Sequence, residues 1–386
     1  MTNKTAQTPK NTSKKTRVAI NGFGRIGRAS FKILLSKPNV EIVAVNDLTN
    51  PRILAHLLKH DSAYGTFNAA VSLVEDSSEV SLDSYRGDKA FYAETASETS
   101  LIVDGVSVQV LSEPNPEKLP WKDLDIDVVL ECTGRFVKDG ASYAHIKAGA
   151  KKVVLSAPAK GECKEACGAI NTYLMGVNAA DYQGEQIVSN ASCTTNCIAP
   201  VVQIMKNAFG VKKSAMTTIH AVTASQNIVD GPHKDMRRAR AAGYNIIPTT
   251  TGAALATTKV IPELEGVFDG MAMRVPVLTG SASDITFLLE QEVTVEQIQE
   301  AFVKAAESEK YKGVVDYSYK PLVSSDIVGS SFSSIVDLNM TKVVDGDLVK
   351  VLAWYDNEWG YSNRLVDLAL LVAGFSQASP EGFSIV

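Results

Sequence analysis

The sequence predicts an α/β fold in two domains: a doubly wound parallel sheet, and an α+β unit whose sheet is mostly antiparallel or mixed. The chain has 386 residues, and domains commonly hold about 100 to 200 residues, so its length allows two. From Thr16 onward, apolar runs alternate with a glycine-rich turn and a helical pattern, as parallel strands and their crossover helices do. The second half carries alternating runs such as "SAMTTIHAV", "MAMRVPVL", "ASDITFLLE" and "DLVKVLAWYD", which are typical of antiparallel or mixed strands.

A glycine-rich turn joins the first apolar run to the first helical pattern. The spacing Gly22-x-Gly24-x-x-Gly27 follows Val18–Ile20 and opens the helical stretch Arg28–Leu35. The first glycine allows a tight turn, the second lets the backbone approach a pyrophosphate, and the third lets helix and strand pack closely. The helix N-terminus adds amide donors and the positive end of its dipole. This βαβ unit therefore indicates a Rossmann-type sheet domain.

An acidic residue completes the dinucleotide pattern. Asp47 lies 20 residues after Gly27, at the end of the next apolar run, where a carboxylate can bind the adenosine ribose hydroxyls. The same charge repels a 2′-phosphate, so we expect NAD rather than NADP. A glycine turn in another kind of α/β unit is the alternative, but the glycines and the acid together favour the dinucleotide site.

Further runs extend the first domain. The segments 125–136 ("DIDVVLECTGRF") and 150–158 ("AKKVVLSAP") are expected to be parallel strands that lead into cofactor-contacting loops. Alternating runs between Asp61 and Trp121 suggest antiparallel ribbons around a polar surface excursion. A last helical pattern, "SNRLVDLALLVAGF", can return to this domain. We expect a disordered leader at 1–16, an NAD-binding domain of 17–192 with 359–386, and a catalytic domain of 193–358.

Composition excludes several classes of protein. The net charge of -5 provides no global basic field for nucleic acid or anionic membrane. No apolar run approaches the roughly 20 residues that cross a bilayer, and the basic leader lacks an apolar core of the secretory type. Five cysteines in such a chain indicate a reducing, cytoplasmic setting in which thiols stay free, so a structural disulfide is the minority expectation.

Two cysteines stand in the stretch "SNASCTTNCIAP", residues 189–200. A metal site would need a second pair, which Cys163 and Cys167 could supply, but nothing in the sequence shows that the two pairs meet, so we expect no metal. A disulfide between Cys193 and Cys197 is disfavoured because side chains four apart on a helix have poor geometry for a bridge.

A nucleophile explains the stretch better. Ser192 or Asn190 can cap a helix that begins near Thr194, which puts Cys193 at the end where the helix dipole lowers a thiol pKa and where a backbone amide can face an oxyanion. Cys197, one turn further on, is interpreted as a buried packing residue. His220 closes the strand-like "SAMTTIH" and is the candidate base; a satisfied core histidine is the alternative.

The motifs "INGFGRIGR", "VAVNDLTN", "ECTGRF", "SAPAKG", "SNASCTTN", "NIIPTTTGAA", "MAMRVPV" and "WYDNEWGYSNR" occur in order over nearly the whole chain. In these residues the chain resembles the phosphorylating, NAD-dependent glyceraldehyde-3-phosphate dehydrogenases. The resemblance implies a homotetramer of glycolysis and gluconeogenesis that converts glyceraldehyde 3-phosphate, NAD and inorganic phosphate to 1,3-bisphosphoglycerate. It implies that Cys193 attacks the aldehyde to give a hemithioacetal and then a thioester, and that His220 keeps Cys193 ionised and takes the hydroxyl proton.

The resemblance also assigns binding residues. Phosphate groups would be held by hydroxyls, amides and guanidinium groups, which suit them chemically: Thr223, Arg238 and Arg274 near the substrate, and Ser192, Thr194, Thr251 and Gly252 at the inorganic-phosphate site. The cofactor would contact Gly22, Gly24, Arg25, Ile26, Gly27, Asp47, Thr133, Phe136, Ser156 and Asn357, with Asn357 orienting the nicotinamide carboxamide.

The chain departs from the family in several places. Leu255 stands where lysine is common, and Ser225 where bacterial members often have aspartate, which puts phosphate affinity in doubt. The segments 83–99 and 161–174 are longer than usual; the second adds Cys163 and Cys167, which belong either to a tolerated surface loop or to a redox pair that bridges on oxidation.

Other functions share some of these features. Erythrose-4-phosphate dehydrogenase has similar cysteine and histidine placement without phosphorolysis, and aspartate-semialdehyde dehydrogenase shares the architecture, but the quoted strings favour the first assignment. The basic run "HKDMRRAR", residues 233–240, could bind nucleic acid, but the acidic net charge of the chain favours a subunit interface instead. The resemblance favours the interface too, because in the family this run lies in a loop, the S-loop, that packs across the tetramer interface.

Overall fold

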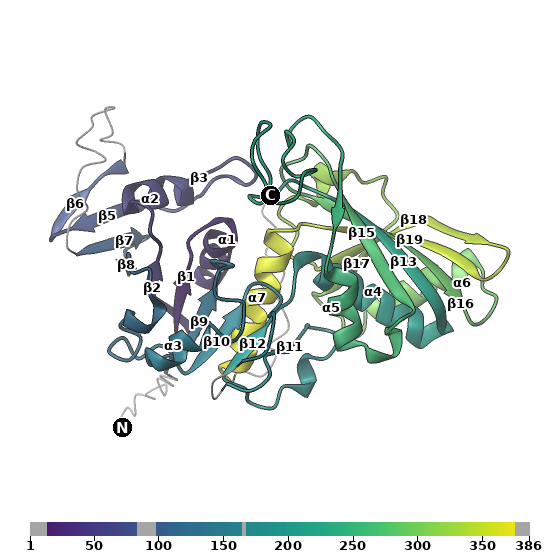
Figure 1. Cartoon of the computed structure of the whole chain (residues 1–386), viewed down its shortest axis with the longest axis horizontal. Helices are drawn as coiled ribbons and strands as arrows, with labels where there is room; N and C mark the ends of the chain where they lie inside the picture. Colours follow the sequence, from purple (N-terminus) through teal and green to yellow (C-terminus); the bar gives the residue numbers. More distant parts are fainter. Residues whose placement is uncertain (1–13, 83–97, 164–166, 375–386) are drawn as a thin grey trace, which may run out of the picture.

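Two large β-sheets with a helix between them form the frame of the protein (Figure 1), and a third, small sheet has two strands. The computed structural model describes residues 14–82, 98–163 and 167–374. The helices are α1 (Arg25–Leu35), α2 (Pro51–Lys59), α3 (Tyr143–Lys147), α4 (Cys193–Phe209), α5 (Ala253–Val260), α6 (Val295–Ala306) and α7 (Trp359–Val372). The strands are β1 (Thr16–Asn21), β2 (Val40–Asn46), β3 (His60–Asp61), β4 (Gly65–Thr66), β5 (Val71–Glu75), β6 (Ser78–Val80), β7 (Thr99–Val103), β8 (Val106–Leu111), β9 (Val128–Glu131), β10 (Lys152–Leu155), β11 (Asn171–Thr172), β12 (Ile187–Ser189), β13 (Val211–His220), β14 (Ile247–Thr250), β15 (Phe268–Arg274), β16 (Ser281–Leu289), β17 (Val315–Ser318), β18 (Ser334–Val344) and β19 (Leu348–Tyr355).

The first sheet has the order β11-β12-β10-β9-β1-β2-β8-β7-β5-β6. Its central strands are parallel, so their carboxyl ends lie along one edge: Asn21 pairs with Glu131, and Glu131 with Leu155. Beyond β8 the strands turn antiparallel, which confirms the expected ribbons. The doubly wound sheet predicted for the first part of the chain is therefore present.

Both faces of this sheet are buried. Along β1, Val18 and Ile20 belong to a core shared with α1 and α7, whereas Ala19 belongs to a second core with Trp121 on the other face. Successive side chains of a strand point to opposite faces, so a continuous apolar run is what a covered parallel strand requires. The helix α7 packs against α1 beside this sheet (Figure 1), which supports its predicted return to the first domain.

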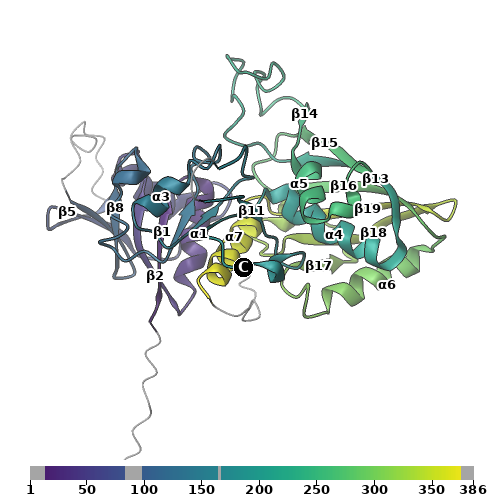
Figure 2. The same cartoon turned by 60° about the horizontal axis from the view of Figure 1, so that its bottom comes forward.

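The second sheet has the order β14-β15-β13-β16-β19-β18-β17 and mixes directions. The strands β13 and β15 are parallel, while β16 pairs antiparallel with β13 and with β19. Residues of α4, α5 and α6 form one core with these strands, and the three helices lie on the same side of the sheet (Figure 2). This confirms the predicted α+β unit.

Some expected boundaries move. The helix α1 begins at Arg25 rather than Arg28, because Gly24 already occupies the N-cap position. Strand β1 begins at Thr16, the last residue of the range expected to be a disordered leader. The rest of that leader up to residue 13, most of the long segment 83–99 and the centre of 161–174 lie outside the described residues. Within the described part of the chain, no helix is long and apolar enough to cross a membrane.

Candidate active site

The predicted catalytic residues meet where α4 begins and where two neighbouring strands of the second sheet end. Cys193 is the first residue of α4, His220 is the last residue of β13, and Arg274 is the last residue of β15. Because β13 and β15 are parallel with His220 opposite Arg274, both side chains emerge at the same edge of the sheet. The Sγ atom of Cys193 lies 3.4 Å from Nε2 of His220.

Local structure holds Cys193 at the helix end. Ser192 is the N-cap of α4, and its hydroxyl oxygen accepts a hydrogen bond from the Thr195 amide at 3.1 Å. This settles the alternative that the sequence left open between Ser192 and Asn190. Cys197, one turn further on, is fully buried in the second core, which confirms its interpretation as a packing residue.

Burial shapes the titration of the pair. Burial raises the pKa of Cys193, and the positive charge of Arg274 opposes that rise. Burial and then Arg274 lower the pKa of His220 to about 3. Considered one residue at a time, these shifts in the pKa of Cys193 and of His220 favour a neutral thiol beside a neutral imidazole, in contrast to the ionised cysteine that the resemblance implies. Moving the proton from Sγ to Nε2 creates opposite charges 3.4 Å apart, whose attraction offsets the desolvation of each.

The other ring nitrogen of His220 is also engaged. Nδ1 lies 2.7 Å from the carbonyl oxygen of Ala221 and 2.6 Å from Nη1 of Arg274. Arg274 donates to the same carbonyl at 3.0 Å. A guanidinium at this distance disfavours a second positive charge on the ring, which is the physical reason for its part in lowering the pKa of His220.

The charge of a second guanidinium group acts on Arg274. The charge of Arg238 contributes to lowering the pKa of Arg274, after burial. Arg274 has no ion pair with a carboxylate among the described residues, and its buried Nε has no hydrogen-bond partner there. Arg238 donates to Thr249 Oγ1 at 2.9 Å and lies 3.6 Å from a carboxylate oxygen of Asp235. A cation without a carboxylate partner, such as Arg274, with the charge of a second cation acting on it, is suited to binding an anion.

The predicted phosphate residues are only partly free to act through their side chains. The hydroxyl of Thr194 is buried and bonds Tyr355 at 3.0 Å, and that of Ser192 caps α4. Thr251 and Gly252 precede α5, with Gly252 as its N-cap. Thr223 bonds the Ser225 hydroxyl at 2.9 Å, so the residue that departs from the family pattern touches a predicted phosphate ligand. Leu255, the other departure, is exposed on α5.

The glycine turn fits a dinucleotide phosphate. Gly22 has φ +94°, and a Cβ there would lie 2.7 Å from the Thr133 amide nitrogen. A Cβ at Gly27 would lie 2.1 Å from the Gly22 carbonyl oxygen, so helix and strand approach too closely for any side chain. Beside Gly24 the space is open, and no side chain caps α1 there. The amides of its first turn, which include Arg25 and Ile26, are therefore available to phosphate oxygens.

The remaining cofactor candidates line the same edge of the first sheet. Asp47 follows β2, and its carboxylate accepts hydrogen bonds from the Phe23 amide at 2.8 Å and the Thr49 amide at 2.9 Å. Thr133 and Phe136 follow β9, and Ser156 follows β10. The arrangement brings these four residues to the carboxyl ends of parallel strands, where doubly wound folds bind their ligands.

Asn357 lies in the segment that joins the end of β19 to the start of α7. Its Oδ1 accepts a hydrogen bond from the Ser281 hydroxyl at 2.8 Å. Among the described residues its amide nitrogen has no partner, which leaves two N–H groups for a carboxamide oxygen. Thus the set of predicted cofactor residues fits NAD in its phosphate, ribose and carboxamide parts.

Sequence reasoning missed several residues that support this site. Tyr355, whose ring packs edge-on against His220, bonds the hydroxyls of both Thr194 and Thr218. Glu131, fully buried, accepts from the Thr133 amide at 2.8 Å and from Asn21 at 2.6 Å, and it also contacts His145. The sequence offered one signal for them, since both lie in strings that carry the family resemblance.

The upstream cysteines contradict the expectation that all thiols stay free. Cys163 and Cys167 form a disulfide, whereas Cys132, Cys193 and Cys197 are free. Cysteine composition reflects only the redox compartment, whereas the loop between these two residues brings their Cα atoms to 6.1 Å, within bridging distance. No group of three or more His, Cys, Asp or Glu residues in the described ranges could hold a metal ion.

A glycine-turn sheet joined to a mixed sheet that carries a paired cysteine and histidine is the architecture of an NAD-binding dehydrogenase. Residues 16–86 and 79–139 match the family model "Glyceraldehyde 3-phosphate dehydrogenase, NAD binding domain", and residues 192–357 match "Glyceraldehyde 3-phosphate dehydrogenase, C-terminal domain". The chain belongs to the glyceraldehyde-3-phosphate dehydrogenase family. It is an oxidoreductase whose cofactor is NAD.

Relatives of known name are similar in sequence to this chain over nearly its full length. A glyceraldehyde-3-phosphate dehydrogenase of Streptomyces coelicolor is 49% identical over 359 residues, covering 92% of this chain and 98% of the relative. The enzyme of Geobacillus stearothermophilus is 48% identical with the same coverage. That of Borreliella burgdorferi is 46% identical over 360 residues, again covering 92% and 98%.

Proposed function

We propose that the chain oxidises glyceraldehyde 3-phosphate to 1,3-bisphosphoglycerate with NAD and inorganic phosphate, with Cys193 as the nucleophile and His220 as its base. The observation that carries the proposal is the 3.4 Å approach of Sγ to Nε2 at the N-terminus of α4, beside Arg274, whose buried Nε has no hydrogen-bond partner among the described residues. A nucleophile within reach of a base, and a cation for an anionic substrate, are what this chemistry needs.

The first step is attack of sulfur on the aldehyde carbon. For His220 to take the thiol proton through Nε2, Nδ1 must carry its hydrogen and donate it to the Ala221 carbonyl, 2.7 Å away. Arg274 must then direct its Nη1 N–H to the same carbonyl, 3.0 Å away, and not to Nδ1. The new C–S bond leaves negative charge on the carbonyl oxygen. Amides at the start of α4 can stabilise that oxyanion, and His220 returns the proton to it to give the hemithioacetal.

The second step converts the hemithioacetal to a thioester. NAD, when bound, accepts the hydride that leaves the carbon. His220 takes the hydroxyl proton as the carbonyl forms again, so one residue serves as base in both steps. Asn357, with its oxygen held by Ser281 and its N–H groups free, suits the carboxamide that sets the ring face.

The third step releases the acyl group. An oxygen of inorganic phosphate attacks the thioester carbon, the C–S bond breaks, and Cys193 regains its proton as the acyl phosphate leaves. We assign Arg274, Arg238 and Thr223 to the substrate phosphate, supported by the charge of Arg238 acting on Arg274, which has no carboxylate partner among the described residues. We assign Thr251, Gly252 and the segment Ser192–Thr194 to inorganic phosphate, mainly through backbone amides, because the hydroxyls of Ser192 and Thr194 already have protein partners.

We assign the adenosine half of NAD to the first sheet. The turn Gly22–Gly27, with the amides of Arg25 and Ile26, would bind the pyrophosphate. Asp47 would bind the ribose hydroxyls, and Thr133, Phe136 and Ser156 would line the rest of the groove.

We also propose a homotetramer that works in the cytoplasm. Large apolar side chains are strongly exposed between residues 228 and 246, a segment that we call the S-loop; they are Ile228, Val229, Met236, Tyr244 and Ile246. Such a concentration of exposed apolar surface is typical of a subunit interface. The basic residues of the same segment therefore need no nucleic acid to explain them.

A phosphate-dependence assay tests the proposed reaction. Purified protein with glyceraldehyde 3-phosphate and NAD should form NADH in many turnovers only when inorganic phosphate is present, and NADP should be a poor substitute. If NADH formation is indifferent to phosphate, the thioester is hydrolysed instead, and the enzyme belongs to the acid-forming branch with erythrose-4-phosphate dehydrogenase.

A further inference from the structure

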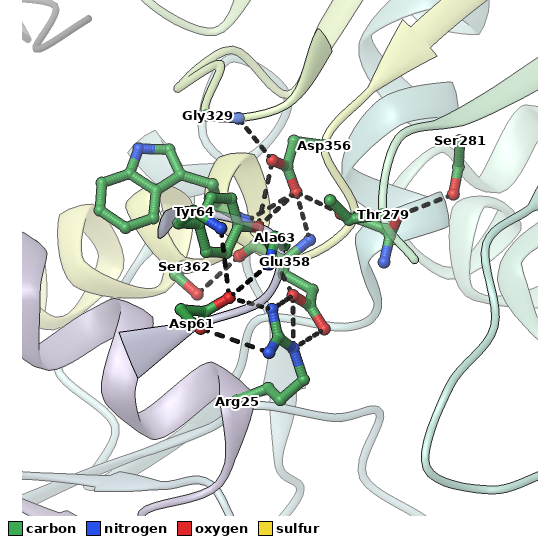
Figure 3. Close-up of polar contacts among 12 residues, drawn as sticks. Arg25, Asp61, Ala63, Tyr64, Thr279, Ser281, Gly329, Asp356, Glu358 and Ser362 are labelled. Carbon is green, nitrogen blue, oxygen red and sulfur yellow. Dashed lines mark hydrogen bonds and ion pairs between the residues drawn. The ribbon is translucent and has the colours of Figure 1, made fainter. Parts of the chain in front are cut away.

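Asn357 stands between two acidic residues that are each held by partners from distant parts of the chain. We call Arg25, Asp61, Tyr64, Asp356 and Glu358 the α7 clamp (Figure 3). Its members come from the N-terminus of α1, from β3 and the turn after it, and from the segment before α7. The clamp therefore joins the glycine turn to the residues around the predicted carboxamide contact.

In one half of the α7 clamp, Arg25 lies between the carboxylates of Glu358 and Asp61. Its Nε donates to Glu358 Oε1 at 2.6 Å and to Oε2 at 2.7 Å, and Nη2 donates to Oε2 at 2.5 Å. On its other side the guanidinium reaches both carboxylate oxygens of Asp61, at 3.2 and 3.3 Å. A group that already faces two carboxylates is poorly placed to neutralise a phosphate. The resemblance assigns Arg25 to the pyrophosphate turn, and its backbone amide can serve there while its side chain does something else.

The pKa shifts of Arg25 and Glu358 indicate a strong ion pair between them. Burial alone would lower the pKa of Arg25, but the hydrogen bonds and charges of Glu358 and Asp61 outweigh it and raise that pKa. Burial raises the pKa of Glu358, which Arg25 opposes. Glu358 is nearly buried, so a carboxylate there without Arg25 would be costly.

Asp356 is the centre of the second half and is almost wholly buried. Its Oδ1 accepts from the Tyr64 hydroxyl, from Thr279 and from the amides of Glu358 and Trp359, all at 2.9 Å. Its Oδ2 accepts from the Gly329 amide at 2.8 Å. A carboxylate with this many donors fixes the backbone on both sides of Asn357 and the start of α7.

The side chain of Asn357 is oriented by the same network. The Ser281 hydroxyl accepts from the Ala221 amide at 3.1 Å, so its own hydrogen is free to point at Asn357 Oδ1, 2.8 Å away. Thr279, which donates to Asp356, lies 3.4 Å from the same oxygen. With Oδ1 committed to a hydroxyl, the amide has only one orientation, with its N–H groups outward.

We propose that the α7 clamp is a positioning device that couples the two ends of the NAD site: the Arg25–Glu358 ion pair ties the glycine turn to the segment that orients Asn357. The inference rests on the proposed role of Asn357. Its consequence is that loosening the clamp weakens binding of the nicotinamide half of NAD, while the adenosine half, held by the turn itself, binds nearly as before. Tyr64, Asp356 and Glu358 are thus positioning residues.

The test compares NAD with ADP-ribose, which lacks the nicotinamide. Glu358→Gln keeps the size of the side chain and removes its charge. By titration calorimetry we expect its Kd for NAD to rise about tenfold and its Kd for ADP-ribose to change less than about twofold. Glu263→Gln, which removes the charge of a surface ion pair with Lys206, is the matched control and should change neither. Arg25→Lys, which keeps the cation, should retain most of the NAD affinity that Arg25→Met loses.

Two further measurements separate the possible failures. Asn357→Ala tests the proposed function itself: if its NAD and ADP-ribose affinities fall equally, the assigned role of Asn357 is wrong, whatever the clamp does. If Asn357→Ala is selective but Glu358→Gln weakens both ligands alike, the clamp is merely structural and the proposal fails. Should Glu358→Gln not fold, Tyr64→Phe removes one donor to Asp356 while keeping the ring, and it must show the same selectivity for NAD over ADP-ribose, in a smaller degree.

Discussion

Nη1 of Arg274 lies 2.6 Å from Nδ1 of His220, while the other ring nitrogen of the same imidazole faces Sγ of Cys193 at 3.4 Å. One cation therefore acts on both partners of the predicted catalytic pair. It lowers the pKa of His220 and opposes the rise that burial imposes on the pKa of Cys193. This geometry makes the protonation of the pair sensitive to whatever binds Arg274.

Replacing Arg274 should move the pH dependence of Cys193. Without the cation the thiol stays protonated to higher pH, so in Arg274→Gln the rise of alkylation rate with pH should shift upward. The measurement is the rate of iodoacetamide labelling of Cys193 against pH, read by mass spectrometry. Arg240→Gln, an exposed arginine that pairs with Asp230, is the control. A shift to lower pH would contradict the assigned influence of Arg274.

The two cysteines of α4 should differ sharply under mutation. Cys193→Ser should lower NADH formation by several orders of magnitude while NAD still binds, because the hydroxyl is a far weaker nucleophile beside the same base. Cys197→Ala should keep most of the activity and lose roughly 1 kcal/mol of unfolding free energy, because it leaves a small cavity in a fully buried site. Steady-state kinetics and denaturant unfolding check both, and retained turnover in Cys193→Ser would defeat the mechanism.

The Cys163–Cys167 pair should respond to redox conditions without involving Cys193. Oxidation by a low-molecular-weight disulfide should protect Cys163 and Cys167 from alkylation, with two thiols oxidised and the reagent reduced to its own two thiols. Cys163 lies against Gly140, close in sequence to Phe136, so NAD affinity should change between the two forms. Cys163→Ser should abolish that change. If both thiols remain alkylatable under oxidant, the pair is not redox-active.

The S-loop should hold the proposed assembly together. Met236 is 87% exposed in the single chain, so Met236→Glu places a charge where we expect a subunit contact. Light scattering should then report a smaller assembly than the tetramer expected for the unmodified protein. Val344→Glu, an exposed apolar residue near the end of β18, should leave the mass unchanged. A wild-type protein that is monomeric at all accessible concentrations would refute the proposal.

Local patterns predicted most of the fold because the residues within each helix or strand carry the pattern that indicates it. The glycine spacing before α1, the apolar runs of β9 and β10 and the alternation in β13 all depend on contacts close in the chain. The helix start at Ser192 and the burial of Cys197 follow from the same kind of local rule.

What the sequence could not predict depends on residues that are far apart. Arg25 and Glu358 are 333 positions apart, and only the packing of α7 against α1 brings them together. Tyr355 forms hydrogen bonds with Thr194 and Thr218, and these three residues lie on three different elements of the fold. The burial that raises the pKa of Cys193 is likewise a property of the assembled core. From the sequence, only the position of Cys193 at a helix N-terminus could be predicted, and that position lowers a thiol pKa.

Trapping the thioester tests most directly whether Cys193 is the nucleophile. Protein is mixed with glyceraldehyde 3-phosphate and NAD in the absence of inorganic phosphate, quenched in acid, and digested for mass spectrometry. We expect a phosphoglyceroyl group on Cys193, formed with NADH and removed when phosphate is added before the quench. An acyl group on any other cysteine, or NADH formation with no acyl group on Cys193, would contradict it.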